Sequence, residues 1–311
     1  MPWVFRGHAE LEWQLLPSAW RSDNPLMIAA RREAERRFDA IQPQQRLIWS
    51  WPPTNFQSGA ATFGANDPAL QKSLTIDTTA ELLLAWDFAL GRNELGLATP
   101  LWSLPPDRAS DPNWLWFAQL PLMADEFSNF ADLPAALALT QHHGVPTRLL
   151  DWTHDPVAAA FFAIERIVKP VAGKSIVVWA LQRQRAPSVR IPGVLFPNGP
   201  QGAPAIDVGL QIVRPPVRDN PYLAAQSGLF TTIAGSGIYF MQSGGNRISV
   251  DEIVVASKPA APVLRKVVLP HESVVDLARI LDREKMSRSA LMPTTDNVAA
   301  DVRRRCTGLA S

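Results

Sequence analysis

Residues 141–153 read QHHGVPTRLLDWT and place two imidazoles, a guanidinium, a carboxylate and two hydroxyls within one short segment. The apolar run LPAALALTQ over residues 133–141 predicts a helix that leads into this motif. After the motif, Asp155 or Thr153 is the expected N-cap and Pro156 the first helical residue, so we expect a second helix over residues 157–168. The motif therefore joins two helices, and it holds the closest grouping of potentially functional side chains in the chain.

The composition favours a protein with a large core and a small substrate. The chain has 311 residues, 47% of them hydrophobic, and a formal net charge of +1. Such a chain can bury a sizeable core, and its weak charge indicates neither a nucleic-acid footprint nor an anionic membrane partner. Cys306 is the one cysteine, and no run of about eighteen apolar residues occurs. These features favour a cytoplasmic protein without disulfides.

The hydrophobic pattern predicts an α+β fold. A strand is expected over residues 3–5, ending at Arg6, Gly7 and His8. We expect further helices over residues 27–38, 78–90, 272–285 and 294–305, and further strands over residues 175–181, 229–234, 237–241, 252–256 and 263–269. Together they predict a mixed, largely antiparallel sheet core with flanking helices, in a single domain over residues 1–311. Residues 42–113 are expected to contain an insertion or extended loop, because much of this region is rich in Pro without a sustained period.

Several of these segments resemble one known family. The segments are WVFRGH at residues 3–8, LLPS at 15–18, the QHHGVPTRLLDWT motif, QSGLFT at 226–231 and SRSALMPTTDNVAADV at 287–302. In this combination they resemble the FRG domain, a family named for its Phe-Arg-Gly signature. The resemblance extends over nearly the whole chain and implies a single FRG-type domain.

The order of these segments also resembles that of ADP-ribosyltransferases, which consume NAD. The resemblance implies that Arg6 holds a phosphate or ribose, and that Asp151 and Thr153 line the nicotinamide-ribose pocket. Arg148 would supply charge for the pyrophosphate. Gly228 stands where those enzymes are expected to carry a catalytic Glu, so a carboxylate would have to come from elsewhere, either Glu252 or Asp151.

We therefore predict one polar pocket. The predicted catalytic residues are Arg6, His142, Asp151, Thr153 and Gln226. The predicted cofactor-binding residues are Gly7, His8, Gln141, Thr147, Arg148, Trp152 and Phe230. NAD is the expected co-substrate. No metal is implied, since no cysteine or histidine spacing matches a zinc site.

Each of these residues has a structural interpretation as well. Arg6 and Asp151 would also suit a buried ion pair that holds the fold together. His142 and His143 are adjacent and diverge on either a helix or a strand, so only one is expected to enter the site. Asp155 is expected to cap a helix rather than catalyse, and the Trp152 indole suits the core as well as a stacking site.

The expected function is use of NAD or a related nucleotide by ADP-ribosyl transfer or glycosidic cleavage, in a toxin or antiphage effector. The expected partners are a small nucleotide and a protein or nucleic-acid acceptor, with no membrane. One alternative is a recognition module that senses a nucleotide or phage component, and another is a nuclease or RNA-binding protein. A cysteine nucleophile, a P-loop NTPase and an α/β-hydrolase are disfavoured, because their motifs do not occur.

Overall fold

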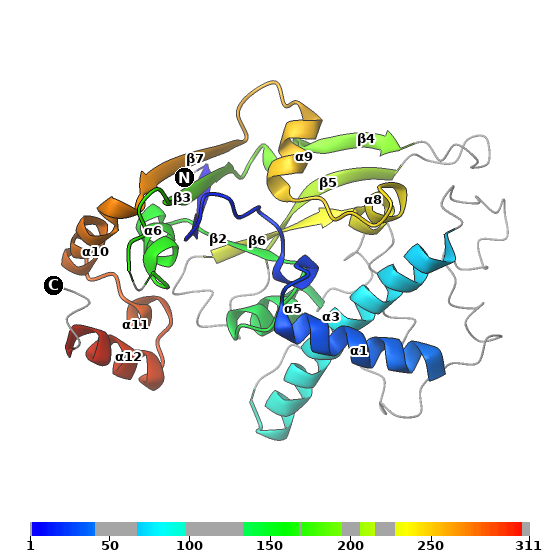
Figure 1. The fold of residues 1–311 in the computed structure, drawn as a ribbon, viewed down its shortest axis with the longest axis horizontal. Helices are drawn as coiled ribbons and strands as arrows, with labels where there is room; N and C mark the ends of the chain where they lie inside the picture. The colour runs from blue at the N-terminus through cyan, green and yellow to red at the C-terminus, as the bar shows by residue number, and fades with distance from the viewer. Residues whose placement is uncertain are drawn as a thin grey trace.

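A computed structural model describes residues 2–40, 67–97, 133–167, 169–194, 206–214 and 228–306. It confirms the predicted α+β class, with a curled sheet of seven strands and helices around it (Figure 1). The strand order is β4-β5-β6-β2-β1-β3-β7, and each neighbouring pair is antiparallel. The strands are β1 (Trp3–His8), β2 (Leu150–Thr153), β3 (Ser175–Gln182), β4 (Arg190–Val194), β5 (Ile206–Val213), β6 (Gly228–Ala234) and β7 (Leu264–Pro270).

The sheet is nearly divided between β1 and β2. These two central strands share a single register pair, Phe5 with Thr153, whereas β1 pairs with β3 along six residues. On the other side, β2 pairs along its whole length with β6. The two parts of the sheet therefore separate next to the Phe5–Thr153 pair, which leaves a gap between β1 and β2. Side chains beside this pair can point into that gap.

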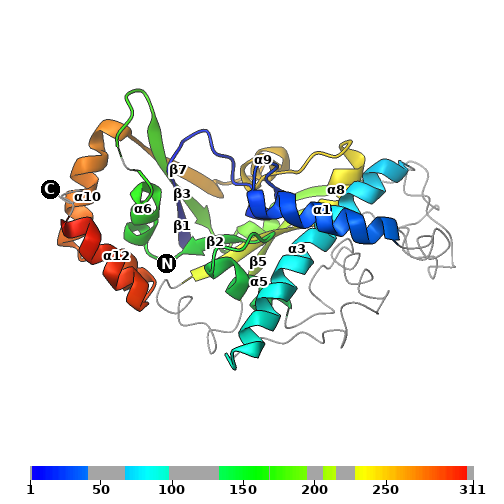
Figure 2. The same ribbon diagram turned by 60° about the horizontal axis from the view of Figure 1, so that its bottom comes forward.

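The helices form groups around the sheet (Figures 1 and 2). Helix α6 lies over β1 with α10 beside it, while α3 packs against both α1 and α5. The α-helices are α1 (Pro25–Ala40), α3 (Pro68–Glu94), α5 (Leu133–His142), α6 (Pro156–Ile164), α8 (Ser236–Gln242), α9 (Val250–Ser257), α10 (Val274–Arg283), α11 (Arg288–Leu291) and α12 (Thr295–Cys306). The 3-10 helices are η1 (Ser18–Trp20), η3 (Ala186–Ser188) and η4 (His271–Ser273). Among the described helices, none is long and apolar enough to cross a membrane.

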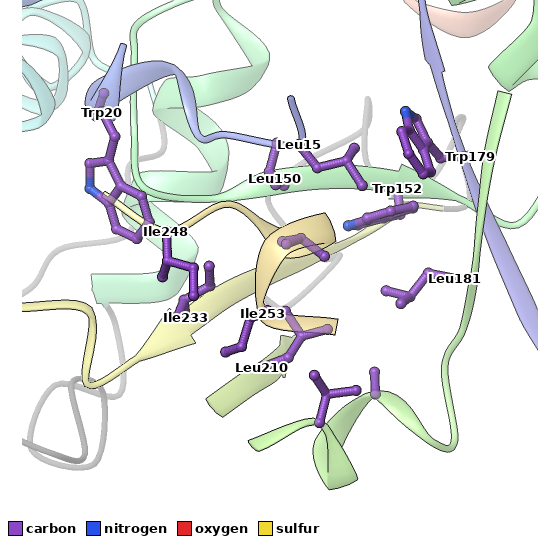
Figure 3. Close-up of a cluster of buried hydrophobic side chains, with 14 of the residues drawn as sticks. Leu15, Trp20, Leu150, Trp152, Trp179, Leu181, Leu210, Ile233, Ile248 and Ile253 are labelled. Atoms are coloured by element: carbon purple, nitrogen blue, oxygen red, sulfur yellow. The ribbon is translucent and has the colours of Figure 1, made fainter. Parts of the chain in front are cut away.

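A large apolar cluster fixes one face of the sheet. It draws on strands from both sides of the gap, on η1 and on α9. Leu150 and Trp152 of β2 point into this cluster, and Asp151 between them therefore points to the opposite face. Figure 3 shows part of the cluster, with Leu15, Trp20, Leu150, Trp152, Trp179, Leu181, Leu210, Ile233, Ile248 and Ile253 gathered around α9.

Gly7 lets helix α6 lie directly on β1. A Cβ atom at this position would lie 2.0 Å from the carbonyl oxygen of Ala159 and 2.6 Å from the amide nitrogen of Ala163. Neither contact can be relieved by a side-chain movement, because both atoms belong to the helix backbone. Glycine is therefore required here by the close approach of the helix.

Two of the predicted strands are wrong. Residues 237–241 belong to α8 and residues 252–256 belong to α9. Both segments are apolar and short, so hydrophobic pattern alone does not separate a strand from a buried helix. The N-terminus of α9 is set by a capping box, in which Ser249 accepts from the Glu252 amide and Glu252 accepts from the Ser249 amide.

Two strands were not predicted, and one was predicted too short. β4 contains a proline and a glycine and β5 contains a glycine, and these residues weaken the strand signal. The first strand does not end at Arg6, because β1 continues through His8. This extension matters for the site, since it places the Arg6 and His8 side chains on a regular strand.

The region from residue 42 to 113 contains a long helix. The helix predicted over residues 78–90 is confirmed, but α3 begins ten residues earlier, where the Asp67 carboxylate caps it. Its Glu81 is 2% exposed, so this helix is part of the core and not a loop. Residues 42–66 and 98–113 lie outside the described part of the chain.

Candidate functional site

A cavity of about 470 Å³ opens where β1 and β2 separate. Its walls come from β1 and β2, the C-terminal end of α5, helix α6, the start of β6 and the segment around α11 and α12. A volume of this size is typical of small-molecule sites. The predicted site residues that line it are Arg6, Gly7, His8, Gln141, His142, Asp151, Trp152, Thr153 and Phe230.

Arg6 and Asp151 join the two separated strands at the floor of this cavity. Arg6 Nη1 donates to the backbone carbonyl of Asp151 at 2.9 Å and forms an ion pair with Asp151 Oδ1. The two residues are 145 positions apart in the chain. Because the ladder between β1 and β2 consists of one register pair, this guanidinium supplies the polar contact that the backbones do not make there. The predicted structural role of the pair is compatible with a site role, because both residues also face the cavity.

Gln141 and Thr147 hold the other side of the Asp151 carboxylate. Gln141 Nε2 donates to Asp151 Oδ1 at 2.9 Å, and Gln141 Oε1 accepts from the Thr147 hydroxyl. Thr147 has no exposed surface and does not line the cavity. It was predicted to bind a cofactor, but its place behind Gln141 makes it a positioning residue. The hydrogen bond from Thr147 fixes which end of the Gln141 amide faces Asp151.

The Asp151 carboxylate is enclosed by protein yet open to the cavity. Its side chain is 48% exposed, and the contacts from Arg6 and Gln141 both reach Oδ1. Burial opposes ionisation, but the charge and hydrogen bond of Arg6 outweigh it and lower the pKa of Asp151 to about 2. Asp151 is therefore an anion at neutral pH, with Oδ1 held by Arg6 and Gln141 in a side chain that lines the cavity.

His8 is neutral and its tautomer follows from its partners. Arg6 Nε donates to His8 Nε2 at 3.0 Å, so this nitrogen is unprotonated. His8 Nδ1 lies 3.3 Å from the Trp13 carbonyl and must carry the proton that it donates there. Burial, together with the charges of Arg6 and Arg21, lowers the pKa of His8 to about 3. His8 thus positions Arg6 and the Trp13 loop, and its protonated form is not populated near neutral pH.

Both His142 and His143 line the cavity, which corrects the prediction that only one would enter the site. The reason is that α5 ends at His142, so His143 starts a turn and is not held at the next helical position. The His142 ring packs edge-on against Phe230, and the His143 ring lies 5.2 Å from that of Phe88. Burial lowers the pKa of each imidazole.

Arg148 does not line the cavity, contrary to its predicted role with a pyrophosphate. Its guanidinium pairs with the Glu81 carboxylate at 2.7 Å, and its backbone amide donates to the same carboxylate at 2.6 Å. Arg148 is 4% exposed and Glu81 is 2% exposed. This buried pair links the QHHGVPTRLLDWT motif to α3, and no ligand can reach the guanidinium without breaking the pair.

Other predicted residues contribute in different ways. Trp152 is 2% exposed and donates to Thr231 Oγ1 at 2.9 Å, so its indole belongs to the core and not to a stacking site. Thr153 accepts from the Asp155 amide at 3.0 Å. Asp155 caps α6, as predicted, by accepting from the Val157 amide at 2.8 Å. Gln226 lies outside the described residues.

Glu252, the other candidate carboxylate, caps α9 and does not line the cavity. Asp151 and Glu165 are the two carboxylate residues that line it among the described residues. Glu165 was not predicted. It pairs with Arg288, whose Nε also donates to Asn297 Oδ1 at 3.0 Å. This pair ties the end of α6 to the segment that carries α11 and α12.

Three arginines that line the cavity were not among the predicted site residues. In addition to Arg6, the cavity is lined by Arg21, Arg166 and Arg288. Arg21 follows η1 and Arg166 follows α6, at positions where sequence pattern does not show which way a side chain points. Four guanidiniums and two carboxylates thus line the cavity, which leaves it with an excess of positive charge. In the described part of the chain, no group of three or more His, Cys, Asp and Glu side chains is placed to hold a metal ion.

Comparison with known families confirms the FRG resemblance for one part of the chain, which does not include the WVFRGH segment. Residues 116–170 match the family model of the FRG domain. This segment includes the described residues that form α5, β2 and α6 and that supply Gln141, His142 and Asp151 to the cavity. Comparison with curated proteins and with solved structures gave no match, so the ADP-ribosyltransferase-like fold stays a prediction.

Proposed function

We propose that this chain, which matches the FRG domain over residues 116–170, binds NAD or a related nucleotide and cleaves its N-glycosidic bond. The acceptor is water or, in ADP-ribosyl transfer, a nucleophile of a protein or nucleic acid. The observation that carries the proposal is the ionised Asp151 carboxylate, held by Arg6 and Gln141 in a half-exposed side chain that lines a cavity of about 470 Å³.

An ionised carboxylate suits the transition state of glycosidic cleavage. Such cleavage passes through an oxocarbenium-like state, in which positive charge develops on the sugar. A fixed anion stabilises that charge without reorganisation at the moment of reaction. Asp151 meets this requirement because Arg6 lowers its pKa to about 2 while half of its side chain stays accessible. In the reaction, the bond between C1′ and the base nitrogen breaks and its electron pair stays on the nitrogen. The acceptor then attacks C1′ and releases its proton.

The protonation states of the cavity favour NAD over a neutral nucleoside. His8, His142 and His143 all have lowered pKa values, so each is mostly neutral near pH 7 and the imidazolium that could protonate a leaving base is scarcely populated. Cleavage of a neutral base requires an acid that protonates the leaving group. The pyridinium ring of NAD already carries the positive charge and leaves as neutral nicotinamide. The cavity thus supplies the anion that NAD cleavage uses. Its described imidazoles are mostly unprotonated near pH 7 and do not supply the acid that neutral nucleosides require.

The test compares NAD consumption by Asp151→Asn with that of the wild type. Asparagine keeps the shape and removes the charge, so we expect a loss of about 100-fold or more in kcat/KM, of the order seen when one stabilising group is removed. Asp276→Asn is the matched control, since the Asp276 side chain is 77% exposed and lies outside the cavity. Thermal unfolding of both variants shows whether the fold is intact. Undiminished turnover by folded Asp151→Asn would overturn the assignment of Asp151.

A recognition module is the second candidate, and one observation favours it. The Arg6–Asp151 pair already compensates the charge of the carboxylate and joins β1 to β2, as a structural pair would. In that case the wild type binds a nucleotide without consuming it, and Asp151→Asn leaves the affinity unchanged. Turnover and binding measured on the same samples separate the two candidates.

A role as a toxin or antiphage effector belongs to the same proposal. An enzyme that consumes NAD depletes a cofactor that its host requires. Expression of the wild type should therefore lower cellular NAD and slow growth, whereas expression of Asp151→Asn should not.

A further inference from the structure

The four arginines of the cavity differ in how their charges are compensated. Arg6 pairs with Asp151, and Arg288 pairs with Glu165. Among the described residues, no carboxylate lies within ion-pair distance of Arg21 or Arg166. A guanidinium keeps its charge in proteins, so these two side chains give the cavity positive charge that no described side chain neutralises.

Arg21 is held in place although it has no carboxylate partner. Its Nε and Nη2 both donate to the Leu16 carbonyl, at 3.2 and 3.1 Å. No acceptor among the described residues reaches Nη1, and the side chain lines the cavity. One edge of the guanidinium is thus fixed by the backbone, and a hydrogen-bond donor remains for a ligand.

The positive charges lie close enough to affect one another. Burial and the charge of Arg6 lower the pKa of Arg21, and the charge of Arg166 acts in the same direction. Asp23 and Asp151 oppose this effect without reversing it. A partly buried cation beside two others is unfavourable unless an anion joins them. The cluster of Arg6, Arg21 and Arg166 therefore has the electrostatic character of an anion site.

We propose that Arg21 and Arg166 bind the diphosphate group of a nucleoside diphosphate or of a dinucleotide, with Arg21 as its fixed anchor. A diphosphate carries more than one negative charge and presents several acceptor oxygens, and planar guanidiniums bind such groups through charge-assisted hydrogen bonds. The subsite deepens the proposed function and rests on it for the ligand class. It assigns the phosphate contact to Arg21 in place of Arg148, whose guanidinium is buried against Glu81.

The test is binding of ADP, AMP and adenosine, measured by calorimetry at low ionic strength. The wild type should bind ADP more tightly than AMP, and AMP more tightly than adenosine. Arg21→Ala should weaken ADP binding about 10- to 100-fold, the effect of losing a charge-assisted contact, and should leave adenosine binding unchanged. Arg21→Lys keeps the charge but loses the planar guanidinium that can bind two oxygens at once. It should therefore bind ADP more tightly than Arg21→Ala and more weakly than the wild type.

Controls keep the result interpretable. Arg190→Ala removes an arginine of β4 that is 60% exposed and does not line the cavity, and it should bind ADP as the wild type does. If Arg21→Ala does not fold, Arg166→Ala decides, because Arg166 is exposed and its loss should also weaken ADP binding. Wild-type ADP affinity in both folded variants, or failure of the wild type to bind ADP, would overturn the subsite.

Failure of the subsite and failure of the proposed function give different results. If Arg21 governs ADP affinity and NAD is never consumed, the subsite stands and the proposed cleavage is wrong. If NAD is consumed and the affinity for ADP does not depend on Arg21 or Arg166, cleavage stands and the subsite is wrong.

Discussion

At the scale of single residues, the cavity is organised by Arg6. Its Nη1 holds the carbonyl and the carboxylate of Asp151, and its Nε holds the ring of His8. His8 in turn donates to the Trp13 carbonyl. One guanidinium thus sets the charge of Asp151, the tautomer of His8 and the position of the loop that follows β1. The protonation states of Asp151 and His8 therefore both depend on the Arg6 side chain.

The neutral state of His8 makes stability depend on pH. The pKa of His8 is lowered to about 3 by burial and by Arg6 and Arg21, while Asp151 opposes the shift. A histidine in an unfolded chain titrates near pH 6.5. Between about pH 3 and 6.5, His8 is therefore protonated in the unfolded chain but not in the folded protein. His8 therefore contributes stability that is fully present above pH 6.5 and is lost as the pH falls. The loss approaches at most about 1.4 kcal/mol per pH unit.

Chemical denaturation of the wild type and of His8→Gln at pH 7 and pH 5 checks this expectation. Gln has no proton to gain, so the free energy of unfolding of His8→Gln should depend less steeply on pH. The other histidines are shared by both proteins and cancel in the comparison. Equal pH dependence in the two proteins would show that His8 is not held neutral.

At the scale of elements, the site depends on how α6 and β1 approach one another. Gly7 removes the side chain that would separate them, and the same strand carries Arg6 and His8 into the cavity. Helix α6 begins at the cap formed by Asp155, directly after β2. The Phe5-Arg6-Gly7 segment thus combines a packing residue with a residue that lines the cavity. Because α6 packs on Gly7 and begins shortly after β2, this packing contributes to the position of Arg6 relative to Asp151.

Gly7→Ala tests this packing. Its Cβ would overlap the helix backbone, so we expect destabilisation of about 1–3 kcal/mol or more. Gly91→Ala is the matched control, because Gly91 lies in α3 with no atom within 4 Å of an added Cβ. That change should stabilise the protein by about 0.5–1 kcal/mol, since alanine favours a helix. Thermal unfolding measures both effects, and an unchanged melting temperature in Gly7→Ala would contradict the close approach.

The elements also show what sequence pattern predicts well. Long helices with clear caps were found where they were expected, and α6 begins at the predicted Asp155 and Pro156. Short apolar segments were not resolved, because α8 and α9 have the composition of buried strands. The long α3 was predicted only in part, since its first ten residues mix polar and apolar side chains without a clear period.

At the scale of the whole molecule, the site is made where the two parts of the sheet separate. Arg6 and Asp151 come from strands that meet at one register pair, far apart in the sequence. Their motifs could be identified from the sequence, and the two residues do lie together. Arg148 could not be placed, because its partner Glu81 lies in a helix that no local pattern connects to the motif. Arg21, Arg166 and Arg288 were missed for the same reason, since only the tertiary fold brings them to the cavity.

The excess positive charge is also a property of the whole cavity, because it is supplied by four separate segments of the chain. A nucleotide that fills the cavity would contact the Asp151 carboxylate and the uncompensated arginines together. The proposed cleavage and the proposed diphosphate subsite therefore describe one ligand in one cavity.

Proton NMR of NAD incubated with the purified wild-type protein tests the central claim most directly. We predict that the signals of the nicotinamide ring of NAD disappear while those of free nicotinamide appear at the same rate. Asp151→Asn should slow both changes by about 100-fold or more. The anomeric proton signals identify whether ADP-ribose is released or transferred. NAD that stays intact in the presence of folded protein that binds it would contradict the account.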